Sequence, residues 1–148
     1  MADLQMVLSE AIKLNRGISQ FLKFSVYKEN DDLSGPDIDF SDGEQCLLWK
    51  TLRHITDKLA DAEEYISYLI RSIIEVSRLR KGTAGKYWTA KGHYYDCCSS
   101  IEVLVTDEYH GVSYWTRTTV ERNGENYYLV AYKGLSMEDL RVRLRSVA

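Results

Sequence analysis

The pattern of hydrophobic and polar positions changes once along the chain. From Asp3 to about Tyr27, apolar side chains recur at alternating spacings of three and four residues, which predicts an amphipathic helix. The apolar positions of this first stripe are Leu4, Val7, Ala11, Leu14, Ile18 and Phe21. One face of the helix is therefore expected to pack against another element.

A second and longer apolar stripe runs from Leu48 to Val76. Ser41 and Glu44 have the S-x-x-E spacing of a capping box, so the helix is predicted to begin at Ser41. No glycine or proline interrupts the stripe before Gly82, which predicts a helix of about 40 residues, roughly 60 Å long. The two helices are expected to form an antiparallel hairpin. Since the long helix exceeds its partner, either the C-terminal half or a second copy of the chain, in a homodimer, is expected to cover the remainder.

Beyond Gly82 the period falls from about 3.5 to two residues. Alternation and β-branched residues predict strands, and Asn123-Gly124 predicts a type I′ hairpin turn. The main predicted strands are Ser100–Thr106, Val112–Glu121, Tyr127–Tyr132 and Leu140–Arg145. The sequence thus predicts an α+β protein: a helical hairpin over residues 1–82, then a small antiparallel SH3-like barrel or curled sheet over residues 83–148.

Composition narrows the classes of protein. The chain has 148 residues, of which 45% are hydrophobic and 28% charged, as expected of a folded protein. A net charge of −3 excludes a wholly basic nucleic-acid coat, and no apolar run approaches the length of a membrane span. The N-terminus lacks the pattern of a secretory signal, and three cysteines do not suit a disulfide framework. A cytoplasmic location is expected.

The acidity is concentrated in residues 28–44, which carry seven acids and one lysine. A calcium loop beginning at Asp37 is disfavoured, because Asp42 replaces the required glycine and Leu48 the required glutamate. Two interpretations remain: a solvated connector, or a phosphate mimic that occupies a basic nucleic-acid channel on a partner. The carboxylates assigned to such mimicry are Asp31, Asp32, Asp37 and Asp39.

The β half combines aromatic and basic residues. The alternation in its last predicted strand places Arg141, Arg143 and Arg145 on one face. Together with Trp115 and Arg117, this arginine stripe is predicted to bind a partner. Stacking and phosphate contacts favour RNA or single-stranded DNA, whereas Trp and Arg are equally the usual anchors of protein interfaces.

No motif for catalysis is present: the sequence lacks a Walker loop, G-x-G-x-x-G after a strand, H-E-x-x-H and G-x-S-x-G. Cys97 and Cys98 are adjacent, which strains a disulfide between them. A zinc site built with His93 and His110 lacks a C-x-x-C, and a nucleophilic cysteine lacks an orienting motif. Structural cysteines are predicted, with no cofactor, no metal and no enzymatic activity.

Several short motifs follow one another in the β half. They are Gly85-Lys86-Tyr87, S-x-I-E-V at Ser99–Val103, W-x-x-x-x-x-E at Trp115–Glu121, Y-Y-L-V at Tyr127–Val130, and K-G-L with R-x-R at Lys133–Leu135 and Arg141–Arg143. On these motifs the segment resembles a small uncharacterised β domain common in plasmids, phages and integrated elements of Firmicutes. It departs from that domain at Cys97-Cys98, and the helical half has no close match.

This resemblance implies a non-enzymatic interaction protein of a mobile genetic element. The class it favours is an anti-CRISPR or other anti-defence inhibitor, whose partner is an RNA-guided nuclease or its complex with guide RNA. The alternative is an accessory module that binds nucleic acid through the aromatic and arginine residues of the β half.

Overall fold

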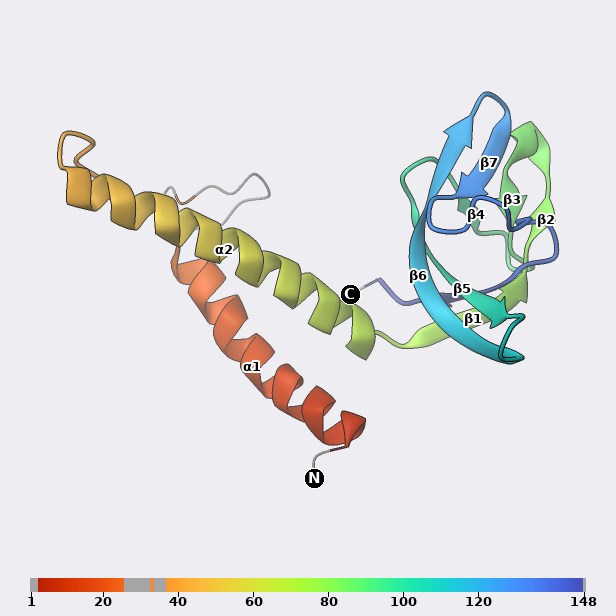
Figure 1. The fold of residues 1–148 in the computed structure, drawn as a ribbon, viewed down its shortest axis with the longest axis horizontal. Coiled ribbons are helices and arrows are strands. Elements are labelled where there is room, and N and C mark those ends of the chain that lie inside the picture. Colours follow the sequence, from red (N-terminus) through yellow and green to blue (C-terminus); the bar gives the residue numbers. More distant parts are fainter. Residues whose placement is uncertain (1–2, 26–32, 34–36, 148) are drawn as a thin grey trace. The chain divides into compact units, whose positions relative to one another are not determined.

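The computed structural model describes residues 3–25, 33 and 37–147. The predicted acidic residues Asp31 and Asp32 lie outside these ranges. The chain forms two compact units, Met1–Ile70 and Arg71–Ala148. The first contains two helices and the second is rich in antiparallel strands, so the predicted α+β class is confirmed (Figure 1). No described helix combines the length and apolar composition needed to cross a membrane.

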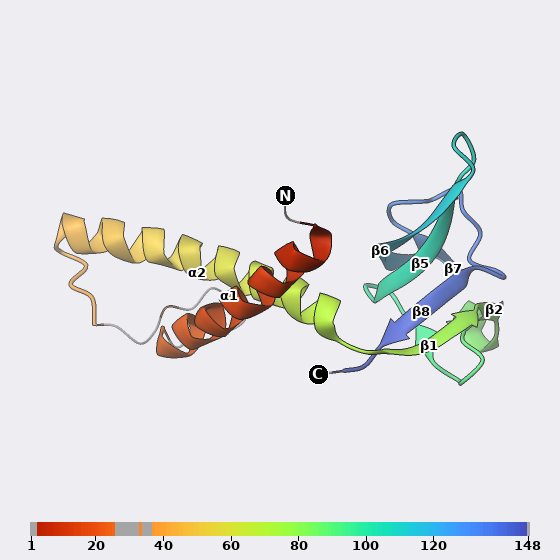
Figure 2. The ribbon, with the colours of Figure 1, turned by 90° about the horizontal axis from the view of Figure 1, so that it is seen from below.

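The helical unit consists of α1 (Leu4–Phe24) and α2 (Gly43–Ile70), which run in opposite directions (Figure 2). Asp3 caps α1 by accepting a hydrogen bond from the Met6 N–H at 2.8 Å. The first turn of α2 is capped in the same way by Asp42, which accepts from the Glu44 N–H at 3.0 Å. The predicted hairpin of helices is therefore present.

The predicted capping box at Ser41 is wrong. Ser41 instead donates its N–H and its hydroxyl to Oδ1 of Asp39, at 3.0 and 2.6 Å. Because that hydroxyl is engaged by the preceding turn, Asp42 supplies the cap and α2 begins at Gly43.

The predicted end of the long helix is also wrong. Instead of running to Gly82, α2 ends at Ile70, and β1 (Ile73–Arg78) follows. The side chains of Glu75 and Ser77 are buried, whereas Val76 is 56% exposed. This alternation, together with the β-branched residues of the segment, suits a strand. The first unit consequently ends at Ile70 rather than near residue 82.

The β unit contains a five-stranded and a three-stranded sheet, in which every pairing is antiparallel. The large sheet has the order β1-β8-β5-β6-β7, and the small sheet has the order β2-β3-β4. The remaining elements are β2 (Arg80–Lys81), η1 (Thr83–Gly85), β3 (Tyr87–Trp88), β4 (Tyr94–Tyr95), β5 (Ser100–Asp107), β6 (Val112–Asn123), β7 (Asn126–Leu129) and β8 (Arg141–Arg145). The large sheet is curled but not closed into a barrel (Figure 1), so of the two predicted forms the curled sheet is correct.

The predicted hairpin between β6 and β7 is present, with a shifted turn. Asn123 pairs with Asn126, so Gly124 and Glu125 are the central residues. Gly124 has φ +65°, and Glu125 is not among the described residues with positive φ. A positive φ at the first central position alone is typical of a type II′ turn rather than the predicted type I′.

One face of the large sheet carries the hydrophobic core. Its most deeply buried side chains are Leu79, Ile101, Val103, Val120, Leu129 and Val142. Val142 lies between Arg141 and Arg143 on β8, so the predicted alternation of that strand is confirmed. The arginines consequently project from the opposite face of the sheet.

Candidate functional site

The face of the large sheet opposite the core is built around a buried carboxylate. Glu102, at the middle of this face, is 6% exposed. The register places it opposite Arg117 on β6 and Arg143 on β8. Arg143 donates from Nε to Glu102 Oε1, and Arg145 donates from Nε to Oε2 at 2.9 Å. The Arg143 guanidinium also stacks over the Trp115 ring, 4.4 Å from its centroid.

The structure therefore brings together four of the predicted binding residues, Trp115, Arg117, Arg143 and Arg145. The alternation of the strand did not indicate that two of these arginines pair with a buried carboxylate. The side chains of Arg143 and Arg145 are only 20% and 13% exposed, and both are paired with Glu102. A buried carboxylate requires such compensation. Glu102 thus compensates one of the two positive charges of this pair within the β unit.

Arg141 is the exposed member of the predicted arginine stripe. It lies opposite Arg78 on β1. Arg78 forms an ion pair with Asp139 at 3.5 Å and donates to the Asp139 carbonyl at 3.1 Å. The positive charge at this edge of the sheet is therefore also partly compensated.

Neither histidine considered for a zinc site lies with the cysteines. His93 Nδ1 lies 3.1 Å from Oε1 of the buried Glu75, and Thr89 donates to the same oxygen at 3.0 Å. His110 Nδ1 contacts Asp107 Oδ2 at 2.6 Å in the turn between β5 and β6. The zinc site of two histidines and two cysteines is consequently not assembled.

Glu75 is a second buried carboxylate, and its hydrogen bonds determine its ionisation. Burial acts to raise the pKa of Glu75, but the hydrogen bonds from His93, the Lys91 N–H, Thr89 and Ser77 outweigh it and lower the pKa. The ionised carboxylate thus ties β1 to the turn between β3 and β4.

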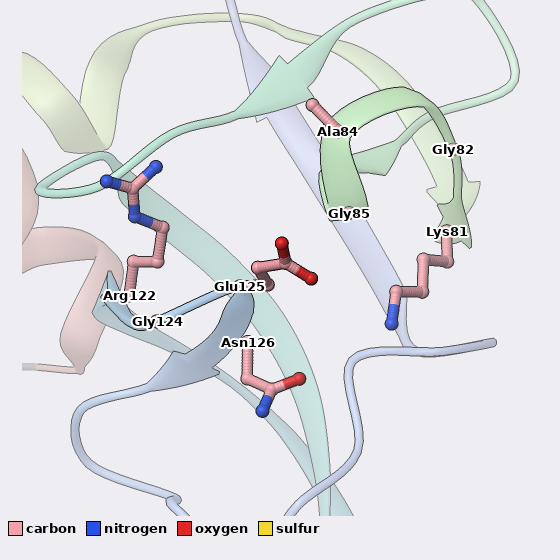
Figure 3. A pocket seen from close by; sticks show the side chains of 8 residues that line it. All are labelled: Lys81, Gly82, Ala84, Gly85, Arg122, Gly124, Glu125 and Asn126. Carbon is pink, nitrogen blue, oxygen red and sulfur yellow. The ribbon is translucent and has the colours of Figure 1, made fainter.

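A pocket of about 580 Å³ lies between the Gly82–Gly85 loop and the turn joining β6 to β7. In the view of Figure 3, the Glu125 side chain lies between Arg122 and Lys81. The side chains lining the pocket supply two cations, one carboxylate and the Asn126 amide. This volume is in the range of small-molecule sites. The lining offers charged and amide groups for binding a polar ligand.

Two glycines shape this pocket. At Gly82, an added Cβ would lie 2.5 Å from Cδ1 of Trp88. Gly85 has φ +73°, and its Cβ would lie 3.0 Å from the Glu125 carbonyl oxygen. Only glycine allows the loop to approach Trp88 and the β6–β7 turn this closely. The spacing Gly82-Thr-Ala-Gly85 was visible in the sequence but was interpreted only as a domain boundary.

Exposed apolar side chains lie near the N-terminal ends of both helices of the helical unit. Asn15 of α1 donates to Ser67 of α2 at 3.4 Å, so the C-terminal end of α2 lies beside α1. Thr56, near the middle of α2, is fully buried, whereas Leu47 and Leu48 nearer its N-terminus are exposed, as are Leu4 and Val7 in the first turn of α1.

The N-terminal part of α2 carries exposed apolar side chains. Leu47 and Leu48 are 62% and 59% exposed, and Phe40 beside the helix start is also exposed. Leu47 and Leu48 line a hollow of about 430 Å³ with Glu44, Gln45 and Thr51. We call Phe40, Leu47 and Leu48, together with Asp37 and Asp39, the acidic–apolar surface of α2.

Two of the four acids that were predicted to mimic phosphates, Asp37 and Asp39, belong to this surface. Both are exposed. The hydroxyl of Ser41, and then its N–H, lower the pKa of Asp39. Asp39 is thus held ionised, although one of its oxygens is committed to Ser41. From the sequence, the acids were predicted to bind a partner, and Leu48 was predicted to lie on the apolar stripe of the long helix, part of which was expected to be covered by the C-terminal half or a second copy of the chain.

Comparisons with known proteins give one match. No curated protein matches the chain, and no solved structure does. Residues 76–144 match the model of a family described as a domain of unknown function, DUF5348. This range covers almost the whole β unit and agrees with the resemblance of that half to an uncharacterised β domain. Residues 76–144 are thus similar to this domain family of unknown function.

Proposed function

We propose that this chain is a non-enzymatic interaction protein that binds another protein through the acidic–apolar surface of α2. The observation that carries the proposal is the exposure of Leu47 and Leu48 near the N-terminus of α2. Adjoining exposed apolar residues bordered by polar ones are typical of interaction sites. Asp37 and Asp39 supply the polar border here.

The charge of this surface indicates the class of partner. Acids beside an apolar contact are complementary to a protein whose own surface is basic, such as one with a channel for nucleic acid. The resemblance of the β half to a domain of Firmicutes mobile elements supports the same class. Within it, the partner we propose is a CRISPR effector nuclease with its guide RNA, and the protein would act as an anti-CRISPR inhibitor in the cytoplasm.

A cleavage assay tests this function. The purified chain is incubated with a Firmicutes RNA-guided nuclease and its guide RNA, target DNA is added, and DNA and guide are both resolved on denaturing gels. We expect blocked DNA cleavage with an intact guide. Normal cleavage would remove that nuclease as the partner, and a shortened guide would indicate an enzymatic mechanism instead.

Matched variants locate the binding surface in the same assay. Leu48→Glu, and the pair Asp37→Asn with Asp39→Asn, are expected to raise the concentration needed for half-inhibition about tenfold or more, because each removes one component of the surface. Val112→Glu is the control, since Val112 is a similarly exposed apolar residue on the β unit. Equal inhibition by all three variants would show that this surface is not used.

The second candidate is a nucleic-acid-binding module that uses the sheet face opposite the core. It is favoured by one observation, the stacking of Arg143 on Trp115, which presents a planar cation and a ring together. Binding of RNA or single-stranded DNA that falls steeply with salt, and that Arg141→Glu weakens, would support it. The absence of binding at low salt would remove it.

A further inference from the structure

Three side chains with metal-ligating atoms meet at one end of the β unit. The Sγ atoms of Cys97 and Cys98 lie 3.5 Å apart. Cys97 Sγ lies 3.1 Å from Oε2 of Glu121, and Cys98 Sγ lies 3.6 Å from Oε1. One ligand atom from each residue lies within 4.8 Å of the other two. Both cysteines are exposed, so the cluster is accessible from solvent.

The backbone holds these ligands in place before any ion arrives. Cys98 has φ +71°, a left-handed conformation that non-glycine residues rarely adopt. Its N–H donates to the Val120 carbonyl at 2.7 Å, and the Val120 N–H donates to the Ser99 carbonyl at 2.9 Å. The Cys97 N–H donates to Asp96 Oδ1 at 2.8 Å. The turn is thereby fixed against β6, next to Glu121.

The distances suit one tetrahedral ion. Two sulfurs at about 2.3 Å from a zinc ion lie about 3.8 Å apart, and a sulfur and an oxygen lie about 3.6 Å apart. The sulfur–sulfur separation of 3.5 Å and the 3.1 Å from Cys97 Sγ to Glu121 Oε2 are each within about half an ångström of these values, and one ligand atom from each of the three residues lies within 4.8 Å of the other two. Small rotations of the side chains would therefore complete the site.

We propose that Cys97, Cys98 and Glu121 form a binding site for Zn²⁺ or a similar thiophilic divalent cation. Three protein ligands leave the fourth position to water or to an exogenous ligand. In the uptake step the ion binds two cysteine sulfurs and one carboxylate oxygen. Each thiol loses a proton to solvent, and no electron is transferred. The site does not depend on the proposed inhibitor function.

The competing use of adjacent cysteines is a disulfide, which the geometry disfavours. Consecutive Cα atoms are about 3.8 Å apart, shorter than the span of about 4.4–6.8 Å that disulfides usually bridge. A metal binds the thiolate form of cysteine, so binding is expected to release up to about two protons per ion.

Cobalt and zinc titrations of the reduced, full-length chain test the site. Co²⁺ is expected to produce thiolate-to-metal charge-transfer absorption that saturates at one equivalent and disappears when Zn²⁺ is added. Proton release is measured in the same titration with a pH indicator. No absorption change, or saturation at a different stoichiometry, would overturn the proposal.

Four variants assign the ligands. Cys97→Ser and Cys98→Ser are each expected to abolish the one-equivalent signal, and Glu121→Gln to weaken Zn²⁺ binding by at least about tenfold. Cys46→Ser is the matched control, because Cys46 lies in α2, where its Sγ donates a hydrogen bond to the Phe40 carbonyl. Circular dichroism and thermal unfolding in the absence of metal show whether each variant is folded. Loss of binding in Cys46→Ser, or unchanged affinity in folded Glu121→Gln, would contradict the assignment.

Discussion

The β unit and the helical unit use their apolar residues in opposite ways. Eleven buried side chains form one hydrophobic cluster in the β unit, and its two buried glutamates are paired. In the described part of the helical unit, the buried hydrophobic residues are Ile18, Leu22 and Leu33. Apolar residues of α1 and α2 that the periodicity predicted to be inside are instead exposed, among them Leu4, Val7, Leu14 and Leu48. Apolar periodicity thus leads to a closed core in the β unit and leaves apolar side chains exposed in the helical unit.

The largest expected effect is on the buried charges of the β unit. Glu102→Ala leaves Arg143 and Arg145 buried without their carboxylate, which should lower the free energy of unfolding by about 4 kcal/mol. Urea denaturation measures this change. Glu108→Ala, at an exposed position in the turn between β5 and β6, is the control and should change stability by less than about 0.5 kcal/mol. Similar values for the two variants would show that the Glu102 network contributes little.

One substitution made in both units compares them directly. Leu79→Ala creates a cavity at a position with 0% exposure and is expected to cost about 3 kcal/mol. Leu48→Ala changes an exposed side chain and is expected to cost less than about 0.5 kcal/mol. Both are measured by urea denaturation of the full-length chain. Equal losses would mean that Leu48 is already buried in the isolated protein.

The fold class and several faces were predictable from the sequence because their patterns were unambiguous. Strict alternation in Leu140–Arg145 placed Val142 inside and the arginines outside, as observed. The end of the second helix was not predictable in this way. Ile73 and Val76 continue the helical spacing, yet they belong to a strand whose inward side chains are polar, Glu75 and Ser77. That inversion depends on hydrogen bonds from the turn between β3 and β4, which no local pattern indicates.

The residues of the candidate sites were likewise only partly predictable from the sequence. Asp37, Asp39 and the arginine positions were identified from composition, but the partner of the arginines, Glu102, comes from another strand. The meeting of Cys97 and Cys98 with Glu121 likewise depends on how the turn before β5 pairs with β6. Contacts between distant segments require the strand register, which a single sequence does not specify.

The pH dependence of stability tests the second buried glutamate of the β unit. Since the folded-state pKa of Glu75 is lowered, its ionised form contributes stability above its unfolded pKa of about 4.3. That contribution is lost as the pH falls through the folded-state pKa. Urea midpoints at about pH 7 and about pH 3.5 should therefore differ less for Glu75→Gln than for the unaltered chain. An unchanged difference would indicate that Glu75 does not titrate with folding.

Self-association is tested with variants at exposed positions, which are expected to change the stability of the chain least. A second copy of the chain is one partner that α2 could bind, as the predicted homodimer through the long helix requires. In that case sedimentation velocity should show a dimer that increases with concentration and is lost in Leu48→Glu, whereas Val112→Glu should retain it. A monomer at every concentration would leave a different protein as the partner.

Native-state hydrogen exchange of the isolated, dilute chain tests the central contrast most directly. If the N-terminal end of α2 binds a partner, amides in its first turns, around Leu47 and Leu48, should open at free energies well below those of β5 and β8. Exchange from those helical residues only at the free energy that opens β5 and β8 would contradict the account, because it would show that the helical unit needs no partner to be stable.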